Sequence, residues 1–274
     1  MPASEPLDPA RLRALLGIDE PGQSDDGQLW RDVEWVASTG STNADLAERA
    51  RGTAADGVVR ISEEQSAGRG RFERRWVSPA GASLACSLLL RPTQPAQNWG
   101  WLSLLTGMSV AAGVERATGA AAGRVELKWP NDVLVDGRKL CGILSERVES
   151  PHGAAAVVGF GINVSLDADQ IPVPTGTSLR LAGLSEDKTV LMAEVLAEFS
   201  RLYRVWDRDG QVHDEYEQRC SSIGAPLRVM VDEHNQVLGT GDSVDQYGRL
   251  VVRTPQGLQA FSAGDVFHLR LQQG

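Results

Sequence analysis

The sequence predicts an α+β protein, in which strands alternate with helices, with a small all-β unit at the carboxyl end. Between Trp30 and Cys220, apolar strand-like runs alternate with segments of helical spacing. Asp136 and Gly137 separate two apolar runs, which is a β-hairpin signal. After Ile223 only short alternating strands follow. A hairpin among strands and helices favours an α+β sheet over a doubly wound parallel one.

Taken in order, the chain divides into three expected parts: a poorly packed leader, 1–30, a main domain, 31–222, and an all-β domain, 223–274. The leader has little apolar periodicity and one short helix, expected near 9–16. In the main domain, residues 41–52 begin with a Ser/Thr/Asn cap and read as a helix. Strands are expected within 30–38, 56–65, 82–92, 124–149 and 154–166, and further helices within 98–119, 188–208 and 212–220.

Composition excludes several classes of protein. The chain has 274 residues, of which 42% are hydrophobic, enough for a sizeable core. Neither a long apolar run nor a secretory signal is evident, so the cytoplasm is the expected compartment and no membrane partner is expected. A net charge of -9 argues against a general nucleic-acid binder. The three widely spaced cysteines are expected to be reduced, buried thiols: Cys86, Cys141 and Cys220.

One basic stretch stands out in this acidic chain: EEQSAGRGRFERRW, residues 63–76. It is neither a dinucleotide fingerprint nor a P-loop. Gly68 and Gly70 free the backbone to turn N–H groups toward an anion, and Arg69 and Arg71 add planar donors that match carboxylate or phosphate oxygens. The stretch therefore suggests an anion clamp, with a solvated basic loop as the alternative.

A second stretch, KWPNDVLVDGRKLCGIL, places Lys128 and Lys139 on either side of a hairpin. Pro130 directs Asn131 and Asp132 into a turn just past a strand end. A carboxylate near lysines can hold Mg²⁺ or orient an ammonium against a phosphate, and Lys139 with Arg69 could stabilise charge that develops during acyl or phosphoryl transfer. A surface Asx turn is the alternative.

Five motifs, in this order and spacing, resemble the catalytic domain of bacterial biotin protein ligases over about residues 35–164: STGSTNADL, EEQSAGRGR, WVSPAGASLACSLLLRP, LKWPNDVLVDGRKLCGIL and GFGINV. The resemblance implies a mixed sheet like that of class II aminoacyl-tRNA synthetases, and a weaker match implies a small SH3-like barrel at the carboxyl end. It further implies two steps. Biotin and MgATP give biotinyl-5′-AMP and pyrophosphate, and biotin then passes to a lysine of a biotin carboxyl carrier domain of acyl-CoA or pyruvate carboxylases.

The resemblance also assigns site residues. Those implied to bind biotin are Ser41, Thr42, Asn43, Gln65, Arg69, Gly70, Arg71 and Lys139. Those implied to bind ATP or the adenylate are Arg71, Trp76, Asn131, Asp132 and Asn163, with Mg²⁺ near Asp132. The catalytic group is Arg69, Lys139, Lys128 and Asp132. Simple helix capping by residues 41–43 and a core position for Trp76 are the structural alternatives.

Two departures from the family pattern matter. Phe72 and Glu73 stand where the family commonly has Arg or His and then Gly, which predicts a less flexible and less basic clamp. The leader is too short for the winged helix of the bifunctional repressors, so a ligase without repressor function is expected. Nucleic acid is therefore not expected to be a partner. A lipoate-type acyl ligase, a biotin-sensing repressor and a non-catalytic binding module remain the rival interpretations. The clamp is expected to be disordered until biotin and ATP bind.

Overall fold

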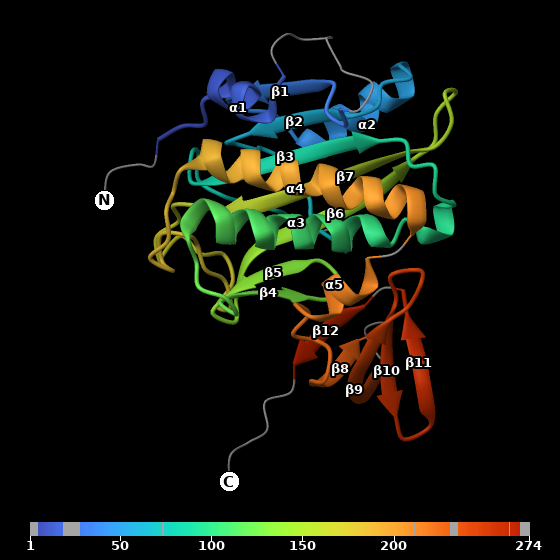
Figure 1. Ribbon diagram of the computed structural model, residues 1–274. Coiled ribbons are helices and arrows are strands. Elements are labelled where there is room, and N and C mark those ends of the chain that lie inside the picture. The colour runs from blue at the N-terminus through green and yellow to red at the C-terminus, as the bar shows by residue number, and fades with distance from the viewer. Residues whose placement is uncertain are drawn as a thin grey trace.

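The computed structural model describes residues 5–18, 28–72, 74–210, 212–230, 235–262 and 264–268. The main domain is built on a seven-stranded sheet (Figure 1). Its strands are β1 (Asp32–Val36), β2 (Val58–Ser62), β3 (Ser83–Leu90), β4 (Val125–Lys128), β5 (Asp132–Val135), β6 (Arg138–Val148) and β7 (Ala155–Asn163). The spatial order is β1-β2-β3-β7-β6-β5-β4, with β1 and β2 parallel and the other neighbours antiparallel. The sheet is therefore mixed, as the resemblance implies.

Helices cover this sheet on both faces. Two long helices, α3 (Trp101–Thr118) and α4 (Lys188–Asp209), lie side by side over one face (Figure 1). Alternate residues of β3, Leu84, Cys86, Leu88 and Leu90, point into the core that these helices share. On the other face, α2 (Thr42–Gly52) covers a smaller apolar cluster that includes Leu89. Because side chains alternate between the two faces of a strand, one set packs against α3 and α4. The other set points to the opposite face, which α2 partly covers.

The segment before β1 differs from the poorly packed leader that the sequence predicts. The short helix α1 (Pro9–Leu16) forms where expected, with Asp8 accepting hydrogen bonds from the N–H groups of Ala10 and Arg11. However, Leu7, Leu12 and Ile18 are buried in the main core. Only a few apolar residues anchor the segment, and their wide spacing gives no periodic signal in the sequence. Residues 1–4 and 19–27 lie outside the described residues.

The Asp-Gly hairpin and the all-β domain form as predicted. Asp136 and Gly137 both have positive φ angles, 51° and 71°, at the turn between β5 and β6. A short helix, α5 (His213–Glu217), precedes a five-stranded antiparallel sheet, in the order β11-β10-β9-β8-β12. Its strands are β8 (Pro226–Met230), β9 (Gln236–Val244), β10 (Leu250–Thr254), β11 (Gly257–Phe261) and β12 (Asp265–His268).

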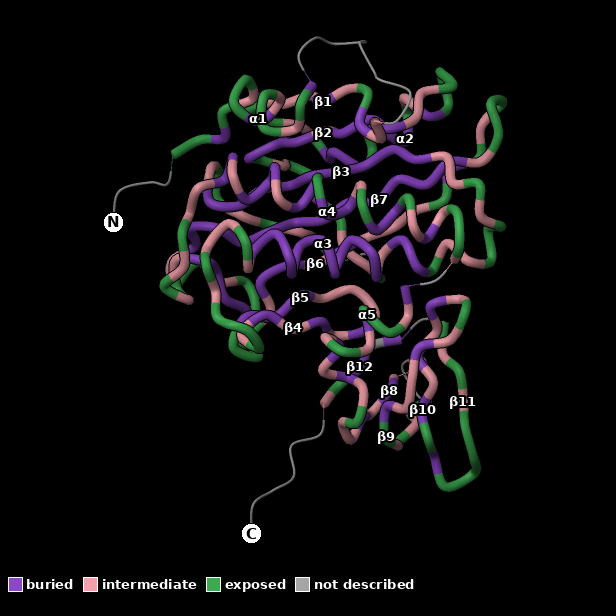
Figure 2. Tube along the Cα trace, viewed as in Figure 1, coloured by how far each residue is buried: buried purple, intermediate pink, exposed green. Residues whose placement is uncertain are grey.

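Tryptophan side chains of the main domain connect it to this second sheet. Trp129 donates its indole N–H to the carbonyl oxygen of Gly248 at 3.0 Å, and Trp101 donates to that of Gln246 at 3.1 Å. Buried residues run through β3, β7, α3 and α4, whereas the hairpin between β10 and β11 is exposed at its tip (Figure 2). The second domain is therefore joined to the first by specific contacts as well as by the chain.

The three cysteines are free and buried, as expected. Burial raises the pKa of each thiol: Cys86, Cys141 and Cys220. At neutral pH they are therefore protonated side chains that pack rather than react. In the part of the chain that the structure describes, no helix is both long and apolar enough to cross a membrane.

Candidate active site

A cavity of about 320 Å³ opens over the sheet face opposite α3 and α4. Here the register of β3 and β7 places small residues opposite one another: Ser87 faces Gly159, and Ala85 faces Gly161. Farther along the same two strands, Leu89 and Val157 occupy this face and lie in the apolar cluster beneath α2. The cavity exists because the side chains of β3 and β7 on this face are small beyond the part of the sheet that α2 covers.

The structure brings the sequence-predicted residues together with one exception. Those that line the cavity are Ser41, Thr42, Asn43, Gln65, Arg69, Gly70, Arg71, Trp76, Asn131, Asp132, Lys139 and Asn163. Lys128 is not among the lining residues. Its charge acts instead on His268 of β12, in the carboxyl-terminal sheet.

The start of α2 forms a polar wall of this cavity. Ser41 is the N-cap residue, and its hydroxyl accepts a hydrogen bond from the N–H of Ala44 at 3.4 Å. The N–H of Thr42 donates to Gln65 Oε1 at 2.8 Å, which ties the helix end to the loop after β2. Ser41 therefore both caps α2 and lines the cavity, whereas Thr42 and Asn43 line it from within the first turn of the helix.

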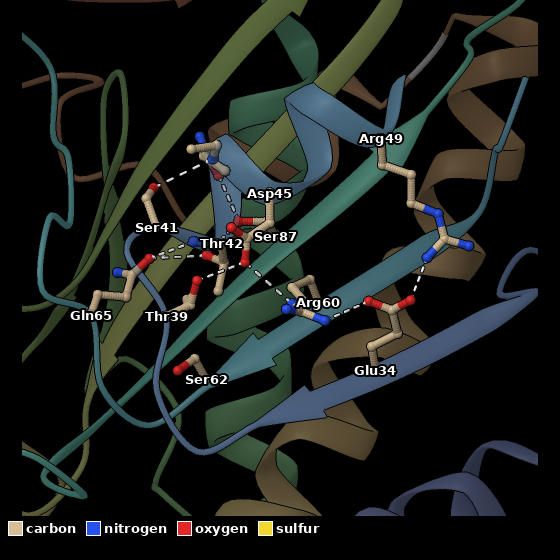
Figure 3. Close-up of polar contacts among 12 residues, drawn as sticks. Glu34, Thr39, Ser41, Thr42, Asp45, Arg49, Arg60, Ser62, Gln65 and Ser87 are labelled. Carbon is tan, nitrogen blue, oxygen red and sulfur yellow. Dashed lines mark hydrogen bonds and ion pairs between the residues drawn. The ribbon is translucent and has the colours of Figure 1, made fainter. Parts of the chain in front are cut away.

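A network of ion pairs and hydrogen bonds connects α2 to β1, β2 and the loop before α2 (Figure 3). Asp45 in α2 accepts from Thr39 Oγ1 at 2.8 Å and from Arg60 Nε of β2 at 3.3 Å. Arg60 also donates to Glu34 of β1, which in turn pairs with Arg49. The backbone N–H of Thr39 donates to the carbonyl oxygen of Glu64. These contacts position two loops that carry cavity residues, 39–41 and 64–67.

The basic stretch forms a hairpin, which we call the clamp (residues 68–76). The N–H of Trp76 donates to the carbonyl oxygen of Gly68 at 3.0 Å, and the N–H of Gly70 donates to that of Arg74 at 2.6 Å. A Cβ atom on Gly68 would lie 2.5 Å from the Trp76 carbonyl oxygen, so this close approach needs glycine.

Phe72 stands at the tip of the clamp with φ at 53°, and its side chain is 57% exposed. The guanidinium of Arg71 lies 4.9 Å from its ring. The departure from the family pattern at Phe72 therefore places an aromatic ring against an arginine of the clamp. Glu73, the other departure, lies outside the described residues.

Positive charge dominates the cavity lining. Five of its side chains are cationic and one is a carboxylate: Arg69, Arg71, Arg74, Arg75 and Lys139, against Asp132. Lys139 Nζ lies 2.5 Å from Asp132 Oδ1, and Arg71 donates to Asn131 Oδ1 at 3.2 Å. In a chain of net charge -9, this local excess suits an anionic ligand.

Sequence reasoning missed the glycines of the cavity floor. A Cβ atom on Gly159 would lie 2.0 Å from Asn43 Oδ1, and one on Gly161 would lie 2.5 Å from the Trp76 ring. Trp76 thus lies over the sheet rather than in the main core. The signal was available, because GFG in a buried strand puts two glycines on one face.

A groove of about 750 Å³ adjoins the cavity and shares Arg71, Asn131 and Leu144 with it. Aromatic residues from both domains line this groove, namely Trp99 and Trp129 of the main domain and Tyr247 of the second. The cavity therefore has a neighbour large enough to receive part of a second molecule.

The chain is similar to known proteins over both domains. The family model described as "Biotin/lipoate A/B protein ligase family" matches residues 35–163, and the one described as "Biotin protein ligase C terminal domain" matches residues 224–269. The biotin--[acetyl-CoA-carboxylase] ligase of Mycobacterium tuberculosis is 38% identical over 269 residues, which cover 97% of each chain. The chain belongs to the biotin protein ligase family. It is accordingly an enzyme, a ligase of this kind.

Other biotin protein ligases agree in sequence and fold. The ligase of Paracoccus denitrificans is 34% identical over 85% of this chain and 98% of its own length, and the bifunctional ligase/repressor BirA of Escherichia coli is 31% identical over 96% and 79%. The Aquifex aeolicus enzyme, solved in complex with biotin and ATP, superposes with a TM-score of 0.73 at 24% identity, over 88% of this chain and all of that one. At that identity the superposition shows the shared fold, an SH3-like second domain included.

Proposed function

We propose that this protein activates biotin with MgATP to biotinyl-5′-AMP, releasing pyrophosphate, and then transfers biotin to a lysine of a biotin carboxyl carrier domain. The observation that carries the proposal is one cavity whose lining combines a polar wall at the start of α2 with five cationic side chains. The wall offers hydroxyl and amide groups for a neutral polar ring, and the cations suit a carboxylate and a phosphate. The family membership and the named activities of the relatives support the same reaction.

The first step joins two anions. A biotin carboxylate oxygen attacks the α-phosphorus of ATP, and the bond to the pyrophosphate leaving group breaks. Arg69 and Lys139 lower the repulsion between the two anions and stabilise the charge that develops on the phosphoryl oxygens. Asp132, 2.5 Å from Lys139, orients the ammonium toward the ligand.

In the second step the neutral amine of the acceptor lysine attacks the acyl carbon of the mixed anhydride, and AMP leaves. The developing negative charge on the acyl oxygen lies near the same cations, so one set of donors serves both steps. A closed clamp keeps water from the anhydride. The groove shared with the second domain gives the acceptor domain a place to dock beside the cavity.

Magnesium would enter with the nucleotide. Among the described residues, no group of three or more His, Cys, Asp or Glu side chains could hold a metal ion. Mg²⁺ is commonly bound by one or two carboxylates together with substrate phosphates and water, and Asp132 is the carboxylate that lines the cavity. The residues therefore fit an ion carried mainly by ATP, which would neutralise phosphate charge.

Isotope exchange between pyrophosphate and ATP tests the first step, because it requires reversible formation of the acyl adenylate. We expect exchange with biotin and none with lipoate or without an acid. Exchange with lipoate alone would overturn the assignment in favour of a lipoate-type ligase. Transfer of labelled biotin to a purified apo carrier domain, compared with the carrier whose acceptor lysine is changed to arginine, tests the second step.

A further inference from the structure

Glu146, in β6, is a carboxylate beside the cavity with no role in the function proposed above. Its Oε2 atom accepts a hydrogen bond from Asn43 Nδ2 at 2.7 Å and one from Arg69 at 2.9 Å. Asn43 belongs to the polar wall and Arg69 to the clamp. One oxygen atom therefore joins the polar wall to the clamp.

We propose that Glu146 is a positioning residue: it is the counter-ion that holds the clamp arginine in the resting enzyme and fixes the amide of Asn43. This inference rests on the proposed function, because the bound anion that replaces Glu146 as the partner of Arg69 is the carboxylate or phosphate of the ligand. Lys139 and Asp132 form a similar pair. Both cations that the reaction needs thus have a carboxylate partner within the protein before a ligand arrives.

The strand register explains how Glu146 reaches this place. In β6, Gly142, Leu144 and Glu146 lie on the same face, opposite Gly161, Gly159 and Val157 of β7. This is the cavity face of the sheet. Glu146 lies between the cavity floor and the part of the sheet that α2 covers. Its side chain therefore contacts the first turn of α2, at Asn43.

The hydrogen bonds around Asn43 have a defined direction. Ser87 Oγ lies 2.6 Å from Asn43 Oδ1 and 2.7 Å from Thr42 Oγ1. Asn43 Oδ1 can only accept, so the single hydroxyl proton of Ser87 is directed to it. The hydroxyl of Thr42 has its own acceptor, Gln65 Oε1, at 3.1 Å. The chain of hydrogen bonds then runs from Ser87 through Asn43 to Glu146, whose carboxylate is the final acceptor.

The contacts of Asn43 leave its amide one orientation. Its Oδ1 faces Ser87, its Nδ2 donates to Glu146 and to the carbonyl oxygen of Leu144 at 3.3 Å, and Gly159 lies directly against it. Removing the negative charge of Glu146 weakens the charged hydrogen bond of this set and releases Arg69 at the same time. Removing the carboxylate of Glu146 should therefore change both the affinity for biotin and the motion of the clamp.

Amide hydrogen exchange on the full-length enzyme tests the proposal. The N–H groups of Gly70 and Trp76 close the clamp hairpin. In Glu146→Gln we expect them to exchange about threefold to fivefold faster without ligand, the range expected for a partly exposed ion pair. With biotin and MgATP bound, exchange should equal that of the unmodified enzyme, because Arg69 then has a ligand anion as partner. In steady state, the KM for biotin should rise severalfold while kcat stays within about twofold.

Glu149→Gln is the matched control. Glu149 follows β6 directly and pairs with Arg147 at 2.7 Å, but both side chains are more than half exposed. This variant removes the same charge and should change neither the exchange nor the KM. Glu146→Asp, which keeps the charge but shortens the side chain, should fall between Glu146→Gln and the unmodified enzyme.

Equal clamp exchange in ligand-free Glu146→Gln and Glu149→Gln would overturn the proposal. Faster exchange of Glu146→Gln both with and without ligand would also overturn it, since that pattern indicates a general structural role. If biotin and MgATP fail to protect the clamp of the unmodified enzyme, the proposed function is wrong, while the ligand-free comparison still decides the role of Glu146.

Discussion

Lys128 and Lys139 come from the two outer strands of one three-stranded unit, yet only Lys139 reaches the cavity. Lys128 ends β4 opposite Asp132, and its charge acts on His268. Lys139 follows the turn into β6 and lies against Asp132 from the other side. The sequence analysis places both lysines in the catalytic group, but the structure gives them different environments.

We predict that Lys139→Met lowers biotin-dependent pyrophosphate exchange about a hundredfold or more, because a fixed donor at developing charge is worth about 3 kcal/mol. Lys128→Met, which removes the same charge outside the cavity lining, should lower it less than about threefold, as expected for a screened, more distant charge. The measurement is the exchange rate at saturating biotin and ATP. A similar loss in both variants would show that Lys128 takes part in the reaction.

Gly159 provides a test of the cavity floor. In Gly159→Ala the new Cβ would meet Asn43 Oδ1 at 2.0 Å, so the Asn43 amide has to move. We expect biotin to bind roughly tenfold more weakly, the effect of about 1.4 kcal/mol, measured by calorimetric titration. Gly52→Ala is the control, since nothing lies within 4 Å of a Cβ there. Unchanged binding in Gly159→Ala would mean that Asn43 does not contact biotin.

At the scale of elements, a buried ion pair joins α4 to the loop after β2. Lys188, in the first turn of α4, has a side chain that is 1% exposed and pairs with Glu63. Its ammonium also donates to the carbonyl oxygen of Gly81 at 2.7 Å, and Glu63 accepts from the N–H of Leu7. A lysine at a helix N-terminus opposes the helix dipole, so these partners explain why it is accommodated there.

We predict that Lys188→Met lowers the free energy of unfolding by about 3–5 kcal/mol, because Glu63 would remain buried without its cation. The nearby pair of Arg11 and Asp187, at 3.0 Å, is the matched case with exposed side chains. Arg11→Met should cost no more than about 1 kcal/mol. Urea unfolding followed by tryptophan fluorescence measures both; equal small losses would contradict the burial of the Lys188 pair.

At the scale of the whole molecule, the contact between the two domains includes a titratable group. His268 Nε2 lies 3.1 Å from Ser222 Oγ, near the boundary of the domains. Burial, and then the charge of Lys128, lower the pKa of His268. The folded protein therefore favours the neutral imidazole more strongly than the unfolded chain does.

It follows that His268 makes stability depend on pH. As pH falls below the unfolded value of about 6.5, the unfolded chain takes up a proton that the folded protein binds more weakly, so stability is lost. We expect the free energy of unfolding to fall less between pH 7.5 and 5.5 in His268→Gln than in the unmodified protein. Identical pH profiles of the two proteins, in urea titrations at each pH, would refute this role.

The sequence by itself determined the order of the elements and most of the chemistry of the site. Periodicity, caps and the Asp-Gly turn are local properties, so strands and helices could be predicted from short windows. The motifs around Arg69 and Lys139 also mark functional residue types locally. Together they predicted the mixed sheet and about half of the residues that line the cavity, most of them polar or charged; the glycines and apolar residues of its floor were missed.

Only the tertiary structure decided which side chains face one another. The separation of Lys128 from Lys139, the burial of Leu7 and Leu12, and the place of Glu146 between Asn43 and Arg69 depend on strand register and on packing across the sheet. A shift of one residue in β6 would turn Glu146 away from the cavity. Such contacts join residues far apart in the chain, and no local pattern in the sequence specifies them.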